Sequence, residues 1–197
     1  MTAIFDYGAG NLRSVENALD HIGAAYEVVR DSAALKRGSK IILPGVGHFG
    51  QMMRALDQLG VRETLRQQLR LGVPFLGICL GLQALFERSA EAPEVEGLGL
   101  FPGTIERFPQ EARVPHMGWS DITISRPSRW FPDPMPSRYV YFAHSYFLPV
   151  TEGTLATCYY GAPFTAAFAS GHIFGVQFHP EKSGPLGLAL IRRFIQL

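Results

Sequence analysis

Apolar and polar positions in the first half of the chain follow two alternating periods. Short apolar runs predict β-strands at residues 2–6, 26–29, 40–43 and 74–78. Between these runs, apolar side chains recur every three or four positions, which predicts amphipathic helices at 12–22, 49–59, around 65–69 and at 79–87. The run at 74–78 is almost wholly apolar, as expected of a central strand covered on both faces. Strands that alternate with helices predict an α/β fold with an open, mostly parallel central sheet flanked by helices.

The second half has a different pattern. Short β-like runs, separated by glycine and proline, lie at 100–101, 113–114, 122–124, 139–142, 154–159 and 172–178. They predict additional antiparallel strands packed on the parallel sheet. Prolines crowd residues 127–136, which is typical of a stiff surface loop, and an apolar-faced helix is expected around 190–194. A chain of 197 residues without a linker predicts a single domain over residues 1–197.

Composition limits the classes of function. Hydrophobic residues make up 47% of the chain and charged residues 18%, a normal globular balance that predicts a substantial core. The formal net charge is +1 and no long Lys/Arg run occurs, so we expect neither nucleic acid nor a membrane surface as a partner. No stretch approaches the ~18 apolar residues of a membrane span. The first residues lack a targeting pattern and there are two cysteines, which predicts a cytoplasmic protein without a disulfide scaffold.

Cys79 lies in a pattern that carries chemistry. The segment Gly-Ile-Cys-Leu-Gly at 77–81 stands where an apolar strand meets a helix, which is the nucleophile-elbow pattern with cysteine in place of serine. The sharp turn places the sulfur beside a helix N-terminus, and the flanking glycines remove side chains that would collide. The alternative is a buried cysteine that acts as a small hydrophobic residue.

A base and a carboxylate follow the last predicted strand. His179 and Glu181 flank Pro180, and residues two apart in an extended chain share a face. The imidazole would act as the base for a cysteine nucleophile, and the carboxylate would orient it. Taken alone, these residues also fit a strand end with an ordinary surface histidine. Together with the Cys79 elbow they predict a Cys-His-Glu catalytic site.

Two glycine-rich segments also follow predicted strands. Residues 44–47 (Pro-Gly-Val-Gly) could turn backbone N–H groups toward an oxyanion, together with the N–H of Leu80, although a plain strand-to-helix turn is the alternative. Residues 8–10 (Gly-Ala-Gly) resemble half of a dinucleotide fingerprint, but Arg13 stands where the third glycine belongs. The His, Cys, Asp and Glu residues show no metal-ligand spacing. We therefore expect neither a nucleotide cofactor nor a metal.

Taken together, these segments resemble the triad glutamine amidotransferases, whose glutaminase domains carry Gly-x-Cys-x-Gly and, near the C-terminus, His-x-Glu. The resemblance covers essentially the whole chain. Within that superfamily, the chain is similar to the glutaminase subunits of imidazole glycerol phosphate synthase in histidine biosynthesis. The segments that carry this similarity are 6–12 (Asp-Tyr-Gly-Ala-Gly-Asn-Leu), 44–47, 114–119 (Val-Pro-His-Met-Gly-Trp), 144–146 (His-Ser-Tyr) and 177–183 (Gln-Phe-His-Pro-Glu-Lys-Ser).

The resemblance implies a mechanism. Cys79 would attack the side-chain amide of glutamine, and His179 would protonate the departing ammonia and then activate water against the glutamyl thioester. Glu181 would orient His179. The resemblance further implies an oxyanion hole and a glutamine site, with Gly47 and Leu80 in the former and Gly45, Gln83, Ser145 and Tyr146 in the latter.

The resemblance also implies a partner, a (β/α)₈ cyclase subunit that would receive the ammonia through a protected tunnel. Asn11 and the segment around Trp119 would face it. Partner binding often precedes glutamine hydrolysis in this superfamily, and the peptide groups of the glycine-rich strand 45–47 are the expected point of control. Two positions depart from the pattern: Ser120 stands where asparagine is usual, and Phe147 where tyrosine is usual. We expect both to affect the substrate rim or the interface rather than the triad.

Three other functions remain open from the sequence. The first is a glutaminase that serves another synthase, for pyridoxal phosphate or anthranilate, with the same chemistry and a different ammonia acceptor. The second is a cysteine peptidase or γ-glutamyl hydrolase, which would use the same triad on a peptide-like substrate. The third is a non-catalytic sensor or chaperone, whose function would survive replacement of Cys79 by serine.

Overall fold

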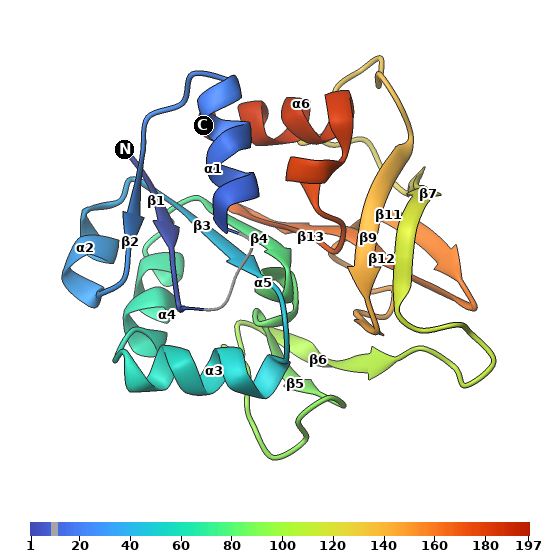
Figure 1. The fold of residues 1–197 in the computed structure, drawn as a ribbon, viewed down its shortest axis with the longest axis horizontal. Helices are drawn as coiled ribbons and strands as arrows, with labels where there is room; N and C mark the ends of the chain where they lie inside the picture. The colour runs from blue at the N-terminus through green and yellow to red at the C-terminus, as the bar shows by residue number, and fades with distance from the viewer. Residues whose placement is uncertain (9–11) are drawn as a thin grey trace.

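The computed structural model describes residues 1–8 and 12–197, and an eight-stranded sheet forms its centre (Figure 1). The strands lie in the order β2-β1-β3-β4-β13-β12-β11-β8. The first five of these run parallel: β2 (Tyr26–Val29), β1 (Thr2–Phe5), β3 (Lys40–Gly45), β4 (Phe75–Cys79) and β13 (Ile173–Val176). The other three continue the sheet antiparallel: β12 (Ala162–Ser170), β11 (Thr154–Tyr160) and β8 (Thr123–Ile124).

Helices cover both faces of the parallel strands. On one face, α1 (Leu12–His21) and α6 (Gly184–Ile195) pack against side chains such as Ile4 and Ile42. On the other, α2 (Ser32–Arg37), α3 (Phe49–Gln58) and α4 (Arg62–Arg70) pack against side chains such as Phe5 and Leu43. Neighbouring residues of one strand point to opposite faces, so strands buried on both sides are apolar throughout. This arrangement confirms the predicted α/β fold with its mostly parallel, helix-flanked sheet.

Two smaller sheets flank the carboxyl ends of the central strands. One contains β10 (Tyr146–Phe147), β6 (Phe101–Arg107) and β5 (Phe86–Ser89), and the other pairs β7 (His116–Asp121) with β9 (Tyr139–His144) antiparallel. Figure 1 shows β7 and β9 side by side at one edge of the molecule, beyond the end of α6. Strand β5 follows the Cys79 elbow along the chain, and strands β9 and β10 contain or flank residues 144–146 of the predicted site.

The helix predicted at 79–87 is wrong in its second half. The helix α5 spans only Leu80–Gln83, and β5 begins at Phe86. Phe86 pairs with Phe101 in the neighbouring strand and its ring contacts Phe168 edge-on, with ring centroids 5.2 Å apart. Tertiary pairing of this kind overrides the local helical spacing.

Other differences are smaller. The strand predicted at residues 113–114 is wrong: these residues form no strand, and the carbonyl of Arg113 accepts from the hydroxyl of Tyr160 at 2.6 Å. The short helix α2 was not expected, although Asp31 caps it by accepting from the N–H of Ala34 at 2.8 Å. Within residues 1–8 and 12–197, no helix has the length and apolar character that a membrane crossing needs.

Candidate active site

Cys79 ends strand β4 in a strained backbone conformation. Its φ is +53°, which an L-residue adopts at a cost. Close packing explains the flanking glycines, because a Cβ on Gly77 would lie 2.5 Å from the carbonyl oxygen of Gly81, and a Cβ on Gly81 would overlap the carbonyl oxygen of Leu43. The turn thus follows the expected nucleophile elbow, and the glycines are required by the approach of β3 and α5.

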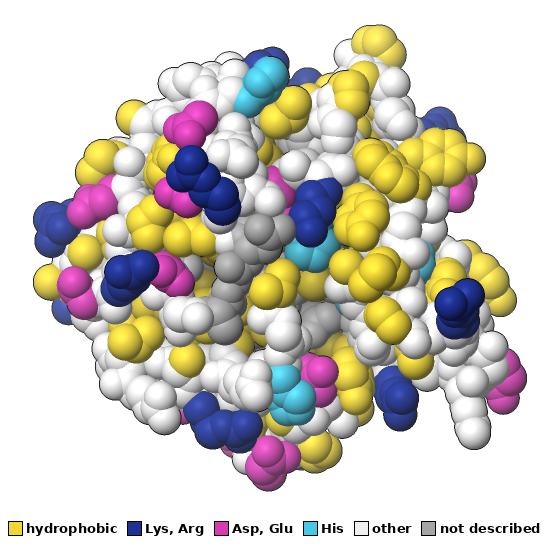
Figure 2. All heavy atoms as spheres, in the orientation of Figure 1, with side chains coloured by type: hydrophobic (Ala, Val, Ile, Leu, Met, Phe, Trp, Pro, Cys, Tyr) yellow, Lys and Arg dark blue, Asp and Glu magenta, His cyan; other side chains and the backbone are white. Residues whose placement is uncertain are grey.

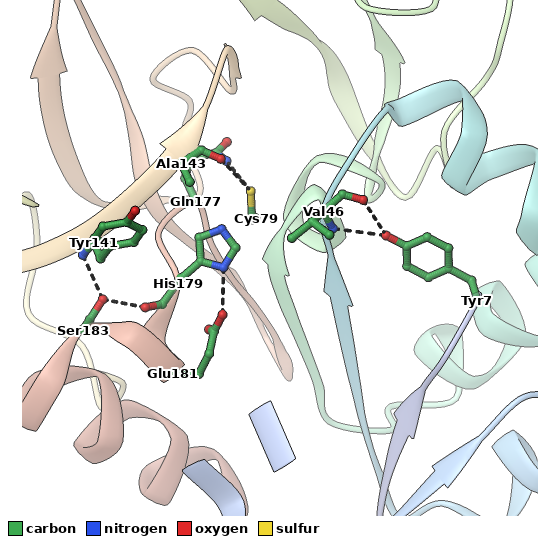
Figure 3. Close-up of polar contacts among 9 residues, drawn as sticks. All are labelled: Tyr7, Val46, Cys79, Tyr141, Ala143, Gln177, His179, Glu181 and Ser183. Atoms are coloured by element: carbon green, nitrogen blue, oxygen red, sulfur yellow. Dashed lines mark hydrogen bonds and ion pairs between the residues drawn. The ribbon is translucent and has the colours of Figure 1, made fainter. Parts of the chain in front are cut away.

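His179 and Glu181 form a buried pair beside this elbow. The Nδ1 of His179 lies 2.8 Å from Oε1 of Glu181, and both side chains are almost fully buried. The reasoning that predicted this contact was wrong in one respect, because Glu181 lies in a 3₁₀ turn (Pro180–Lys182) rather than in an extended chain. The turn brings the carboxylate back under the ring (Figure 3).

The backbone of His179 is held on both sides. Its N–H donates to the carbonyl of Tyr141 in β9 at 2.8 Å, and its carbonyl accepts from the hydroxyl of Ser183 at 2.6 Å. Ser183 in turn accepts from the N–H of Tyr141 at 3.0 Å. Figure 3 shows the two bonds that Ser183 makes, to Tyr141 and to the backbone of His179. The ring is therefore anchored between the end of β13 and strand β9.

The surroundings of His179 favour its charged form. Burial by itself lowers the pKa of the imidazole, but the charge and hydrogen bond of Cys79, followed by those of Glu181, raise this pKa to about 10. The second oxygen of Glu181, Oε2, is buried with no hydrogen-bond partner among the described residues. The negative charge of the carboxylate is thus directed at the imidazole, and the site can hold an imidazolium next to a thiolate.

A cavity of about 170 Å³ opens beside the sulfur. Its walls come from the loop after β3, the elbow, the segment after β5 and strands β7, β9 and β10: Val46, Gly47, Cys79, Leu80, Gln83, Glu91, Pro115, Met117, Ala143, His144, Ser145 and Tyr146. A larger hollow, of about 510 Å³, lies elsewhere between Phe86, Phe101 and Phe168. No cysteine or histidine is among the residues that line it, so the Cys79–His179 chemistry assigns the smaller cavity as the candidate site.

Of the predicted glutamine contacts, three line this cavity. They are Gln83, Ser145 and Tyr146. Gly45 does not, because it packs against α5, where a Cβ would lie 2.7 Å from the Cβ of Leu80. Its role is therefore to let β3 approach the elbow. The predicted oxyanion residues Gly47 and Leu80 both line the cavity.

Tyr7 holds the loop that carries Gly47. Its hydroxyl donates to the carbonyl of Val46 at 3.0 Å and accepts from the N–H of Val46 at 3.2 Å. The carbonyl and N–H of a trans peptide point in opposite directions, so the N–H of Gly47 points away from Tyr7. Figure 3 shows Tyr7 and Cys79 on opposite sides of Val46. Gly47 has a φ of +95°, which glycine adopts without strain.

Sequence reasoning missed several polar residues of the site. Glu91 reaches the cavity from the segment after β5, and its carboxylate accepts from the N–H of Phe49 at 2.7 Å. Gln177 is fully buried, and its amide lies 3.5 Å from the sulfur of Cys79. His144, which the sequence marks as a candidate for a supporting role beside the site, also lines the cavity and lies 3.2 Å from His116. The segment 177–183 contains Gln177, but no local pattern shows which way its side chain points.

The two departures from the expected pattern occupy different places. Ser120 lies on β7, with its hydroxyl 2.9 Å from Nε2 of His116. Phe147 is buried in the core, with its ring centroid 4.6 Å from that of Phe108. Phe147 does not line the cavity, so the expectation that it affects the substrate rim or the interface was wrong: the ring fills an aromatic cluster instead.

The predicted partner-facing residues are only partly described. Asn11 lies outside the described residues. Trp119 is 55% exposed on β7, and Met117 on the same strand is 64% exposed. Their side chains point outward while His116 points inward, as the period of a strand requires. Figure 2 shows hydrophobic side chains gathered on the part of the surface where β7 and β9 lie.

The whole sequence has known relatives. The family described as "Glutamine amidotransferase class-I" matches residues 3–197. The chain belongs to this family. The match confirms the resemblance seen in the sequence. Among the described residues of this amidotransferase, no three His, Cys, Asp or Glu side chains are grouped as a metal site needs.

Several curated relatives have names that refer to imidazole glycerol phosphate synthase. A protein of Thermus thermophilus named "Imidazole glycerol phosphate synthase subunit HisH" is 46% identical over 198 residues, covering 98% of both chains. A HisH subunit of Methanothermobacter thermautotrophicus is also 46% identical, over the full length of this chain and 98% of its own. An Arabidopsis thaliana protein named "Imidazole glycerol phosphate synthase hisHF, chloroplastic" is 42% identical, and this amidotransferase aligns with 34% of it.

Solved structures agree on the fold. One titled "Crystal structure of glutamine amidotransferase" superposes with a TM-score of 0.78 at 21% identity and covers 99% of this chain and 97% of its own. Another, "Structure of PurLQS from Thermotoga maritima", has a TM-score of 0.77 at 18% identity, with the same coverage. At these identities the likeness shows the amidotransferase fold alone.

Proposed function

We propose that this amidotransferase is the glutaminase subunit of an imidazole glycerol phosphate synthase. It hydrolyses glutamine to glutamate and ammonia and passes the ammonia to a cyclase subunit. The observation that carries the proposal is the strained Cys79 elbow facing the buried His179–Glu181 pair, in a chain that is 46% identical to HisH subunits over nearly its full length. A cytoplasmic location remains a prediction.

The first half-reaction forms a thioester. The thiolate of Cys79 attacks the side-chain carbonyl carbon of glutamine, and the oxygen takes up the negative charge. The N–H groups of Gly47 and Leu80 stabilise this oxyanion. His179, held as imidazolium, gives its proton to the amide nitrogen as the carbon–nitrogen bond breaks. Ammonia leaves, and the glutamyl group stays on the sulfur.

The second half-reaction hydrolyses the thioester. Neutral His179 takes a proton from water, and the resulting hydroxide attacks the thioester carbon. The carbon–sulfur bond then breaks, so that glutamate and the Cys79 thiolate are released and His179 is again an imidazolium. Glu181 keeps Nδ1 of His179 protonated throughout, which leaves Nε2 to exchange protons with the substrate.

The polar walls of the cavity suit an amino acid. The carboxylate of Glu91 is placed to pair with the α-ammonium group, and the β9–β10 segment at Ser145 and Tyr146 presents polar backbone to the α-carboxylate. Gln83 also lines the cavity and donates to the carbonyl of Tyr146 at 2.9 Å. Such a site holds both charged groups of free glutamine, whereas a glutamine linked through α-peptide bonds inside a chain has no free charges at these positions.

The exposed strand β7 is the proposed docking surface for the cyclase. Met117 lines the cavity and is exposed on its outer side, so a partner that covers it would close the mouth of the site. Trp119 adds exposed aromatic area next to it. Ammonia released at Cys79 would then enter the partner rather than the solvent.

The test is ammonia release from free glutamine. The wild-type chain and Cys79→Ala are compared, each with and without the cyclase subunit of an imidazole glycerol phosphate synthase and its substrate. We expect activity in wild type, stimulation by the cyclase, and none above background in Cys79→Ala. Cleavage of γ-glutamyl peptides in place of glutamine would identify a γ-glutamyl hydrolase. Stimulation by a different synthase would show that the ammonia has another acceptor. Equal rates with and without the cyclase would show that cyclase binding does not control glutamine hydrolysis.

A further inference from the structure

Gln177 makes a contact that the mechanism above does not use. Its side-chain nitrogen Nε2 lies 3.5 Å from the sulfur of Cys79, within hydrogen-bonding distance for sulfur. The residue follows strand β13 and its side chain has no solvent exposure. A buried amide needs partners for both of its ends, so the orientation of this group has to be explained by its neighbours.

The neighbours determine which end of the Gln177 amide faces the sulfur. The carbonyl of Tyr146 can only accept, so the atom of Gln83 that lies 2.9 Å from it is the nitrogen Nε2. This nitrogen also lies 3.0 Å from the side chain of Gln177, to which it donates its second hydrogen. The atom of Gln177 on that side is therefore the oxygen, and the atom at Cys79 is the N–H donor.

The far end of this chain of hydrogen bonds is also determined. Nδ1 of His144 lies 2.8 Å from the same Tyr146 carbonyl and must donate to it. Burial lowers the pKa of His144 to about 3, so the ring is neutral and its Nε2 accepts from His116 at 3.2 Å. Each bond from His116 to Cys79 has one possible direction. Reversing the Gln177 amide would set two donors against each other.

We propose that Gln177 is a catalytic residue of the glutaminase site, which donates an uncharged amide N–H to the Cys79 sulfur and stabilises the thiolate, while Gln83 holds the amide in the donating orientation. This inference rests on the proposed function. The thiolate is present before attack and again when the thioester breaks, whereas the thioester sulfur carries no negative charge. A donor to sulfur therefore stabilises the attacking and the leaving form of Cys79. It does so without adding a second cation beside His179.

Alkylation of Cys79 by iodoacetamide tests this without glutamine. The rate is measured from pH 5 to 10 on the full chain by mass spectrometry of the Cys79 peptide, which separates it from Cys158. In Gln177→Met, which keeps the size of the side chain and removes the donor, we expect the midpoint of the profile to rise by about one to two pH units. Gln177→Glu should shift it at least as far, and Gln83→Met should shift it less in the same direction.

Gln68→Met is the matched control. Gln68 is a buried glutamine on α4 that does not line the cavity, so its profile should match wild type. Under the proposal, kcat for glutamine falls about tenfold in Gln177→Met while KM changes little. An unchanged alkylation midpoint in folded Gln177→Met or Gln177→Glu would overturn the proposed role of Gln177. If neither variant folds, an unchanged midpoint in Gln83→Met would overturn it. The proposed function fails separately, if wild type and Cys79→Ala release ammonia equally.

Discussion

The two cysteines of this protein are buried to the same extent, and their surroundings differ in almost every other respect. Both are 5% exposed. Cys158 lies within strand β11, paired with Phe164 of β12 in regular antiparallel geometry. Cys79 lies at the end of β4 with a φ of +53°. The nearest polar contact of the Cys158 sulfur is the carbonyl of Tyr159 at 3.9 Å, whereas Cys79 lies beside His179 and Gln177.

The comparison shows that burial alone does not make a thiol a nucleophile. At Cys158, burial followed by the charge of Asp121 raises the pKa to about 12, so this thiol stays protonated. At Cys79, an imidazole and an amide donor face the sulfur, and the charge and hydrogen bond of Cys79, followed by those of Glu181, raise the pKa of His179 to about 10. Reactivity therefore depends on which polar groups surround the sulfur, and those come from distant segments of the chain.

The largest expected effect separates the two cysteines directly. Cys79→Ala should lower kcat for glutamine more than about a thousandfold, because the nucleophile is lost. Cys158→Ala should leave kcat within about twofold and reduce stability slightly, through a small cavity. Steady-state ammonia release measures both. Comparable losses in the two variants would contradict the distinction.

Glu181→Gln should have the next largest effect, about 10²–10⁴-fold on kcat. The amide cannot stabilise the imidazolium, so the pKa of His179 falls and the alkaline limb of the kcat/KM profile moves to lower pH. The sign for stability follows from the same shift: His179 stabilises the fold fully below about pH 6.5, and this contribution is lost as pH rises toward 10. Urea unfolding at pH 6 and 9.5 should show a smaller difference in Glu181→Gln than in wild type. A parallel pH dependence would refute the role of this carboxylate.

Tyr7→Phe should have a moderate effect on kcat, because it changes the surroundings of Cys79 and leaves those of Cys158 unchanged. Without the hydroxyl, Val46 loses one hydrogen bond at its N–H and one at its carbonyl, which is part of the Val46–Gly47 peptide, and the N–H of Gly47 is less well oriented. We expect kcat to fall about three- to tenfold, less than the 10²–10³ of a lost oxyanion donor, with KM nearly unchanged. Tyr160→Phe, which removes a bond to Arg113 away from the cavity, is the control. Equal kcat values for Tyr7→Phe and wild type would show that the peptide needs no such support.

The smallest expected effect concerns acid stability. Burial lowers the pKa of His144 to about 3 and that of His116 to about 4. The unfolded chain binds these protons near pH 6.5, so stability is full above that pH and falls as the pH drops toward the folded-state values. In His144→Gln, the loss of melting temperature between pH 7 and 4.5 should shrink by a few degrees. The same substitution at the exposed His21 should not change it, and an undiminished acid loss in His144→Gln would contradict the explanation.

Local order in the sequence determined the parallel half of the fold and the elbow. An apolar run followed by Gly-x-Cys-x-Gly predicts a strand and a nucleophile elbow from neighbouring positions alone. The apolar run indicates strand burial, the spacing of apolar residues indicates the helix, and the glycines indicate a tight turn. The His179–Glu181 contact was predicted for the same reason. The prediction assumed an extended chain, whereas the structure makes the contact through a 3₁₀ turn.

Only the tertiary structure decided what surrounds the sulfur. Gln177 stands 98 residues after Cys79, and its amide acquires a direction through Gln83 and Tyr146, which belong to other elements. Glu91, two residues after the end of strand β5, lines the cavity in a region where the sequence predicted a helix up to residue 87. Contacts of this kind depend on packing between segments far apart in the chain, which leaves no periodic trace in the sequence. The sequence alone thus identified the nucleophile Cys79 and its base, and the fold determined the polar groups that distinguish Cys79 from Cys158.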